Sequence, residues 1–139
     1  MDRPEDIQEY LHLGGALGFM AIHGGGIEPG TEEIARFVAY HSGASLYVYA
    51  GRLATGNLSL HQPSHEMKIE ERALVKRFLN HVKTVVSLHG HGRNDNCAYV
   101  GGLHQSMAQR FVELALPALP HYEWISDPDL IPPGIRGQS

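Results

Sequence analysis

The fold is decided by residues 16–51, which read ALGFMAIHGGGIEPGTEEIARFVAYHSGASLYVYAG. The apolar run 16–22, closed by a histidine and three glycines, predicts a buried strand that leads into a loop. Thr31 is a suitable N-cap, the two glutamates after it suit the first turn of a helix, and Gly43 ends that helix. Residues 45–51 alternate in β-forming side chains and predict a second strand. The stretch therefore predicts a β–α–β unit.

The rest of the chain continues the alternation of strands and helices. In chain order, the patterns predict a short polar helix or lead-in at 5–12, an amphipathic helix at 67–82, a strand at 84–90, a short strand at 98–102, a helix at 103–116 ended by Pro117, and a brief strand at 122–125. Strands that alternate with helices form β–α–β units with parallel strands. We therefore predict a single domain over residues 1–139, of the α/β class, with three αβα layers and a mixed, mainly parallel sheet.

Helical spacing also predicts which side of each helix is buried. In the helix that starts at Thr31, Ile34, Phe37 and Val38 share one face. In the helix at 67–82, the predicted apolar face consists of Ile69, Ala73, Val75, Phe78, Leu79 and Val82.

Composition restricts the classes of protein that this chain can represent. With 42% apolar and 19% charged residues, it is globular rather than disordered. Its formal net charge is −4 and its Lys and Arg residues are scattered, which argues against a nucleic-acid partner. Cys97 is the single cysteine, so an internal disulfide is excluded and a buried, inert thiol is expected.

Neither a membrane anchor nor a secretion signal is predicted. No apolar run reaches the roughly 20 residues needed to span a bilayer. The N-terminal residues MDRPEDIQEY are acidic and polar, unlike a signal peptide. We therefore expect no membrane partner, and a protein that is cytoplasmic or is released without a signal peptide.

Two of the predicted strands end in the same way, with a histidine followed by a glycine. These residues are His23 and His89, and the carboxyl ends of parallel strands are where ligands bind in α/β sheets. Glu28 follows His23 by five residues, and the intervening glycines let the backbone fold back toward His23. His23, Glu28 and His89 together form the ligand set of zinc hydrolases, which leaves a fourth position open for water.

Two alternatives compete with this interpretation. A glycine-rich loop before a helix can bind phosphate through its backbone N–H groups, but HGGGIEPG lacks both the GxGxxG spacing and the P-loop lysine. His91 competes with His89 as the third ligand. We favour His89 because a histidine at a strand end is held more rigidly, as a metal ligand requires, which leaves His91 to contact substrate.

One long motif resembles a known family. HGGGIEPGTEEIA, residues 23–35, resembles the zinc motif of the poly-γ-glutamate hydrolase family, which includes enzymes carried by phages of γ-polyglutamate-coated bacteria and is similar in fold to zinc carboxypeptidases. Further stretches resemble the family in the expected order: LATGNLSLH (53–61), TVVSLHGH (84–91), YVGG (99–102) and ALPHYEWISDPDLIPPGIRG (118–137). The resemblance covers most of residues 16–137.

The resemblance implies that His23, Glu28 and His89 bind Zn²⁺ and that the protein hydrolyses γ-glutamyl amide bonds of poly-γ-glutamate. Zinc would polarise the carbonyl group and lower the pKa of bound water toward roughly 7. A strongly acidic polymer is repelled by a chain of net charge −4, so the cleft should be locally basic.

Residues near the third ligand are candidates for binding this substrate. Arg93 and Asn94 follow the strand that carries His89, and arginine can bind a carboxylate through paired hydrogen bonds. With His91, they form the predicted substrate-binding set. His61 and His65 lie in a polar loop that is expected to cover the site, with His65 on the surface.

The general base is not identified by the sequence. The resemblance implies a catalytic glutamate in a C-terminal strand of the type Gly-Val-Gln-Leu-Glu, which no stretch of these residues matches. Glu66 and Glu123 are the internal carboxylates that could replace it. The resemblance thus implies zinc binding with catalysis weaker than in a fuller member of the family, and an unpaired sheet edge that favours a homodimer.

Two other functions stay open alongside the polymer hydrolase. The first is a zinc-binding domain of the same fold with impaired catalysis, which the missing glutamate favours. The second is a zinc amidohydrolase that acts on a small N-acyl or peptide substrate instead of a polymer.

Overall fold

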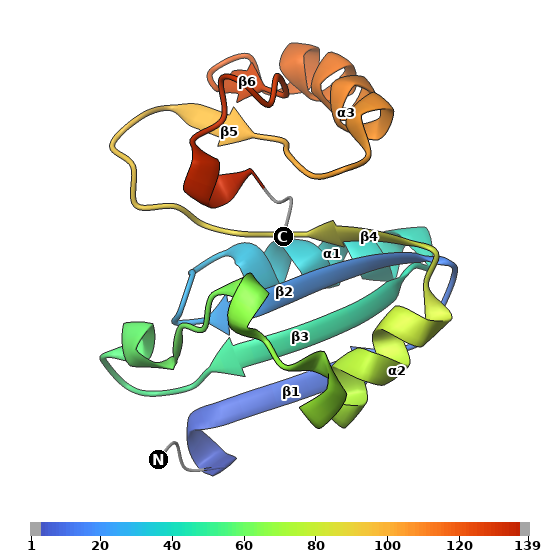
Figure 1. The fold of residues 1–139 in the computed structure, drawn as a ribbon, viewed down its shortest axis with the longest axis vertical. Coiled ribbons are helices and arrows are strands. Elements are labelled where there is room, and N and C mark those ends of the chain that lie inside the picture. The colour runs from blue at the N-terminus through green and yellow to red at the C-terminus, as the bar shows by residue number, and fades with distance from the viewer. Residues whose placement is uncertain (1–3, 137–139) are drawn as a thin grey trace. The chain divides into compact units, whose positions relative to one another are not determined.

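Figure 1 shows the computed structural model, which describes residues 4–136. The chain divides into two compact units, Met1–His91 and Gly92–Ser139. The first contains a four-stranded sheet and the second a two-stranded sheet. The predicted α/β class with a mixed, mainly parallel sheet is confirmed, and the single domain over residues 1–139 stays a prediction.

The sheet of the first unit consists of β1 (Ile7–His12), β2 (Leu17–Gly25), β3 (Ser45–Gly51) and β4 (Thr84–Ser87), in the spatial order β1-β3-β2-β4. β2 pairs in parallel with both β3 and β4, whereas β1 pairs antiparallel with β3. The helix expected at 5–12 is therefore wrong, because this segment forms the 3₁₀ turn Pro4–Asp6 and then β1. As an edge strand with mostly exposed residues, β1 tolerates the polar side chains that suggested a polar helix.

Helices cover both faces of this sheet (Figure 1). α1 (Thr31–Ser42) packs on β2 and β3, and α2 (Ala73–His81) packs on β1 and β3 from the other side. Because side chains alternate along a strand, the core divides into two clusters. The cluster on the α1 side contains Ala21, Leu46, Val48 and Ala50 with Ala35, Ala39 and Ala44, and the cluster on the α2 side contains Met20, Ile22 and Tyr47 with Val75 and Phe78. α2 thus buries two of its predicted residues, and the three-layer order is as predicted.

α1 does not bury the face that its spacing predicted. Its buried apolar residues are Ala35 and Ala39, whereas Ile34 and Phe37 are 54% and 65% exposed. Small side chains on the inner face let the helix lie close to the sheet, which is how two layers pack without gaps. The larger side chains are therefore turned outward.

The second unit contains β5 (Cys97–Tyr99) and β6 (Glu123–Ile125), which pair in parallel, and α3 (Gln105–Ala118), which joins them in the chain. Pro117 lies in the last turn of α3, so the helix ends slightly later than predicted. The remaining 3₁₀ helices span Asn57–Leu60, Ser64–Glu66, Ile69–Glu71 and Pro133–Ile135. Among residues 4–136, none of the helices has both the length and the apolar character needed to cross a membrane.

A buried carboxylate ties α1 to the sheet. Glu32 accepts hydrogen bonds from Arg36 Nε at 3.0 Å and from Arg52 Nη1 and Nη2 at 2.8 and 2.6 Å. Arg52 follows β3 and also donates to Gln8 of β1. Burial alone would raise the pKa of Glu32, but the hydrogen bonds and charges of the two arginines lower it below its ordinary value of 4.5.

Replacing Glu32 with Gln should lower the free energy of unfolding at neutral pH by about 1–3 kcal/mol, because two guanidinium groups lose their charged acceptor. A carboxylate whose pKa is lowered by folding stabilises the protein above pH 4.5 and ceases to do so as the pH falls through its folded pKa. Urea unfolding followed by circular dichroism should therefore show the difference between wild type and E32Q shrinking in acid. An equal difference at neutral and acidic pH would contradict this role.

Candidate metal centre

β2 carries His23 inside its span, because the strand continues beyond the predicted end at residue 22 to Gly25. In its pairing with β3, Ala21 lies opposite Val48 and Gly24 lies opposite Ala50, so the register shifts between these two pairs. β2 thus has one residue more than β3 over this interval, and such a bulge redirects the side chains beside it. His23 is 4% exposed at this point.

The loop after His23 brings Glu28 back to it. The backbone N–H of Glu28 donates to the His23 carbonyl at 2.8 Å, and the Thr31 hydroxyl donates to the Glu28 carbonyl at 2.8 Å. The N-cap of α1 is Gly30 and not the predicted Thr31. Thr31 is the first residue of the helix. Gly25, with φ of 62°, supplies the left-handed turn that this return requires.

His89 reaches the same carboxylate from the end of β4. Its Nδ1 lies 3.5 Å from Oε2 of Glu28, and Nδ1 of His23 lies 3.1 Å from Oε1. The backbone N–H of Gly90 donates to Oε2 at 2.9 Å, and the Ser87 hydroxyl lies 2.9 Å from Nε2 of His89. The structure thus brings His23, Glu28 and His89 together, with one donor atom of each within 4.8 Å of the others.

This set of donor atoms fits a zinc ion. Zinc binds nitrogen and oxygen ligands tetrahedrally at roughly 2.0–2.1 Å, which puts neighbouring ligand atoms about 3.3 Å apart. Nδ1 of His23 lies 3.1 Å from Oε1 of Glu28, and Nδ1 of His89 lies 3.5 Å from Oε2, so each nitrogen is near that distance from a different oxygen of the carboxylate. Two imidazoles and one carboxylate also leave a coordination position open, as in catalytic zinc sites.

His23 has an acceptor in front of each ring nitrogen. Nε2 lies 2.6 Å from the Gln62 carbonyl oxygen, and Nδ1 lies 3.1 Å from the Glu28 carboxylate. A carbonyl can only accept, so Nε2 carries a proton, and the neutral ring then presents a lone pair at Nδ1. A lone pair aimed at a carboxylate requires a proton or a cation between them. A carbonyl behind a metal-binding histidine commonly fixes its tautomer in this way.

The ionisation of Glu28 suits cation binding. Burial would raise the pKa of Glu28, but hydrogen bonds with His23, His89 and the Gly90 N–H hold it at about 2. Burial would lower the pKa of His23, but its hydrogen bonds with Glu28 and Gln62 raise it above 6.5. Glu28 is therefore ionised at neutral pH, which is the form that binds a metal ion.

A further histidine joins the cluster. The His61 ring stacks on His23 with centroids 4.1 Å apart and planes inclined by 28°, and its Nε2 lies 3.6 Å from Oε1 of Glu28. The sequence placed His61 in a covering loop without indicating these contacts. Sequence reasoning missed Gln62 altogether, because its contact with His23 uses a backbone carbonyl that no side-chain pattern signals.

The predicted substrate-binding residues lie on exposed segments of the chain. His91 is exposed at the end of the first unit, and Arg93 and Asn94 are exposed at the start of the second. Arg93 Nε donates to Asp95 at 3.1 Å. The role of these residues in binding substrate stays a prediction.

The two carboxylates considered as a general base have other partners. Glu66 is 62% exposed, and its Oε1 lies 3.8 Å from Nε2 of His65. Glu123 lies on β6, where it accepts a hydrogen bond from Sγ of Cys97 at 3.6 Å. Cys97 itself is half-buried instead of buried, so its expected burial is wrong.

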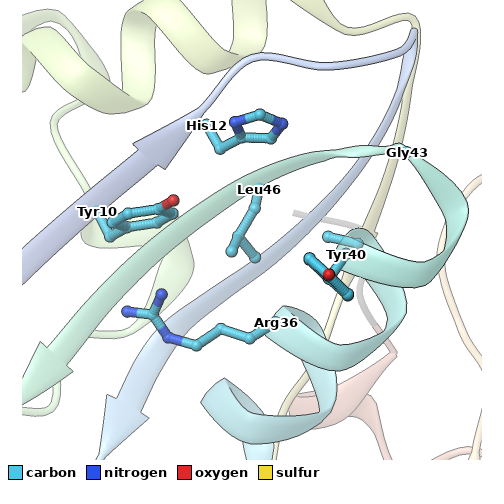
Figure 2. Close-up of a pocket in the computed structure, with 7 residues that line it drawn as sticks. Tyr10, His12, Arg36, Tyr40, Gly43 and Leu46 are labelled. Carbon is cyan, nitrogen blue, oxygen red and sulfur yellow. The ribbon is translucent and has the colours of Figure 1, made fainter.

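Figure 2 shows a hollow elsewhere in the first unit. It has a volume of about 410 Å³ and is lined by Tyr10, His12, Arg36, Ala39, Tyr40, Gly43 and Leu46. Gly43 and Leu46 flank the start of β3, so the hollow lies at the amino end of the parallel strands, whereas His23 lies toward their carboxyl end. Its lining residues contribute one histidine and no carboxylate, and Arg36 lies over the Tyr10 ring. The hollow is therefore a poor metal site.

The first unit is thus an α/β protein with a His–Glu–His cluster at the carboxyl ends of parallel strands. Residues 6–117 match the model of the family described as poly-gamma-glutamate hydrolase, and the chain belongs to that family. UPF0714 protein YndL of Bacillus subtilis (strain 168) is 43% identical over 94 residues, which make up 68% of this chain and 35% of YndL.

Two solved structures share the fold. One is zinc-free apo YndL, which has a TM-score of 0.79 at 30% identity; the match covers 89% of this chain and 58% of the YndL chain. The other, a bacteriophage poly-gamma-glutamate hydrolase, has a TM-score of 0.82 at 21% identity and covers 100% of this chain and 64% of its own. The chain therefore spans less than two thirds of the length of each of these relatives.

The turn at Gly25 gives a test of how tightly the Glu28 loop is built. A Cβ at Gly25 would collide with the Gly51 carbonyl oxygen, whereas one at Gly56, which also has positive φ, would meet open space. Gly56→Ala should cost roughly 1–2 kcal/mol of stability for its left-handed backbone. Gly25→Ala should cost about 1–3 kcal/mol more for the clash. Urea unfolding of both variants measures the difference, and equal losses would contradict the close approach.

Proposed function

We propose that this protein is a zinc-dependent hydrolase that cleaves the γ-glutamyl amide bonds of poly-γ-glutamate. The observation that carries the proposal is the cluster of His23, Glu28 and His89, which gathers a zinc-type ligand set in a member of this family. The sequence reasoning from strand-end histidines and the geometry of the cluster point to the same residues. The chain spans only part of the length of its relatives, so the activity itself is proposed here together with the substrate.

Each residue of the cluster has a distinct part in binding the ion. His23 and His89 would offer Nδ1, and Glu28 would offer its carboxylate, which is already ionised at neutral pH. The Gln62 carbonyl holds His23 in the tautomer that leaves Nδ1 free. Bound zinc would supply a Lewis acid for the amide carbonyl and a water of lowered pKa.

The proposed substrate class rests on the family, and the charge of that substrate sets a requirement on the residues that bind it. Each residue of the polymer carries a free carboxylate, so productive binding needs basic groups near the cluster. We propose that Arg93, Asn94 and His91, which follow His89 within five residues along the chain, bind these carboxylates, with Arg93 providing the positive charge. The group that removes the proton from water is not assigned, and Glu66→Gln and Glu123→Gln variants would test the two internal candidates.

We expect one tightly bound zinc ion per chain. His23→Ala and His89→Ala should each reduce the zinc content of dialysed protein from one equivalent to near none, because a three-ligand site loses a ligand. Elemental analysis measures this, and circular dichroism checks that each variant is folded. His65→Ala, which removes an exposed histidine of the neighbouring loop, is the control and should keep its zinc. Undiminished zinc in both ligand variants would reject the assignment.

We further expect the protein to shorten poly-γ-glutamate and to stop doing so when a chelator removes the metal. Size-exclusion chromatography of the polymer follows the reaction, and α-linked polyglutamate serves as the control substrate. Cleavage confined to the γ-linked polymer supports the proposal. Cleavage of short peptides alone would support an amidohydrolase of small substrates. Zinc binding without cleavage would support the catalytically impaired domain.

A further inference from the structure

His61 contacts two of the three candidate ligands without belonging to the set predicted from sequence. Its ring lies against the face of His23, with centroids 4.1 Å apart, and its Nε2 lies 3.6 Å from Oε1 of Glu28. Oε1 is also the oxygen that faces Nδ1 of His23. The other oxygen, Oε2, faces His89 and accepts the hydrogen bond from the Gly90 N–H.

The segment that carries His61 is fixed by hydrogen bonds of its own. The Asn57 side chain accepts from the Leu53 N–H at 3.0 Å and donates to the Leu53 carbonyl at 2.9 Å. The His61 N–H donates to the Leu58 carbonyl at 3.1 Å, and Leu60 is buried. The next residue, Gln62, provides the carbonyl that holds Nε2 of His23. Two consecutive residues of one rigid segment therefore contact the candidate ligands.

We propose that His61 is a positioning residue of the metal centre, which holds His23 by stacking and holds Glu28 through an N–H at Nε2. The proposal rests on the proposed zinc site. The distance of 3.6 Å exceeds that of a direct hydrogen bond. Catalytic hydrogen bonds are often long in apo structures and tighten in the reacting complex, and a similar shortening on metal binding is part of the proposal. With Gly90 on one oxygen and His61 on the other, both carboxylate oxygens then have an outer donor.

The two contacts of His61 can be separated by substitution. Gln at position 61 can place an N–H near the position of Nε2 but has no ring, and Phe keeps a ring but has no donor. Ala removes both contacts. The matched control is His65→Ala, because His65 lies in the same loop region, is 65% exposed and pairs with Glu66 outside the cluster.

The experiment measures the zinc dissociation constant of each variant by competition with a chelator, together with the visible absorption spectrum after loading with Co²⁺. Removing an outer partner of a metal ligand typically weakens metal binding by roughly 10- to 100-fold. We expect a loss of about this size in His61→Ala, smaller losses in His61→Gln and His61→Phe, and none in His65→Ala. Thermal unfolding of the metal-free forms, unchanged across the series, excludes a general loss of folding as the cause.

The outcomes separate this inference from the function on which it rests. If wild type binds zinc and His61→Ala binds it equally well, the positioning role is wrong and the zinc site stands. If all three substitutions abolish binding and the cobalt spectrum of wild type indicates a ligand beyond His23, Glu28 and His89, His61 is itself a ligand and the positioning role is wrong. If wild type binds no zinc, the proposed function fails first.

Discussion

The partly buried carboxylate of Glu28, and the groups that compensate its charge, organise the carboxyl end of the sheet in the first unit. Its side chain is 13% exposed, so water screens the carboxylate poorly and protein groups must satisfy it. His23 comes from β2, His61 from the segment after β3, and His89 and Gly90 from the end of β4. A single carboxylate thus joins three segments that are distant in sequence, and their positions depend on one another through it.

The start of α1 has a related organisation. Glu28 precedes the helix and Glu32 lies in its first turn, so both carboxylates lie near the helix N-terminus, where the dipole favours negative charge. Glu28 turns toward the histidines, and Glu32 turns toward Arg36 and Arg52. The same short stretch of chain therefore holds the candidate site on one side and fastens the helix to the sheet on the other. The Thr31 hydroxyl, bonded to the Glu28 carbonyl, links the two roles.

The parts of the fold that the sequence predicted are those with a strong local pattern. β3 has the predicted bounds, and β2 and α1 follow from the apolar run, the glycines and the acidic first turn. The proximity of His23, Glu28 and His89 was predictable because strand ends in a parallel sheet converge on one edge. β1 was not predicted as a strand, because an edge strand with mostly exposed residues needs little alternation of apolar and polar side chains.

The other features that the sequence did not predict are those in which contacts with distant parts of the chain decide which side chains are buried or paired. The inner face of α1 is built from alanines, and hydrophobic spacing alone favoured Ile34 and Phe37. The contacts of His61 and Gln62 depend on how an irregular loop folds back over β2, which no periodicity encodes.

In both His23 and His89, the ring nitrogen nearer the backbone faces Glu28. A short link between the main chain and the donor atom gives a donor little freedom to move outward, so the main chain of each segment limits the space between the nitrogens and Glu28. The dense glycines around both histidines follow from this, since the main chain must come close without side chains in the way. Such a space suits ions that bind at about 2.0–2.1 Å. It disfavours calcium, which needs oxygen ligands at about 2.3–2.6 Å. Two imidazole nitrogens beside one carboxylate thus favour zinc over calcium by the type of donor atom as well as by distance.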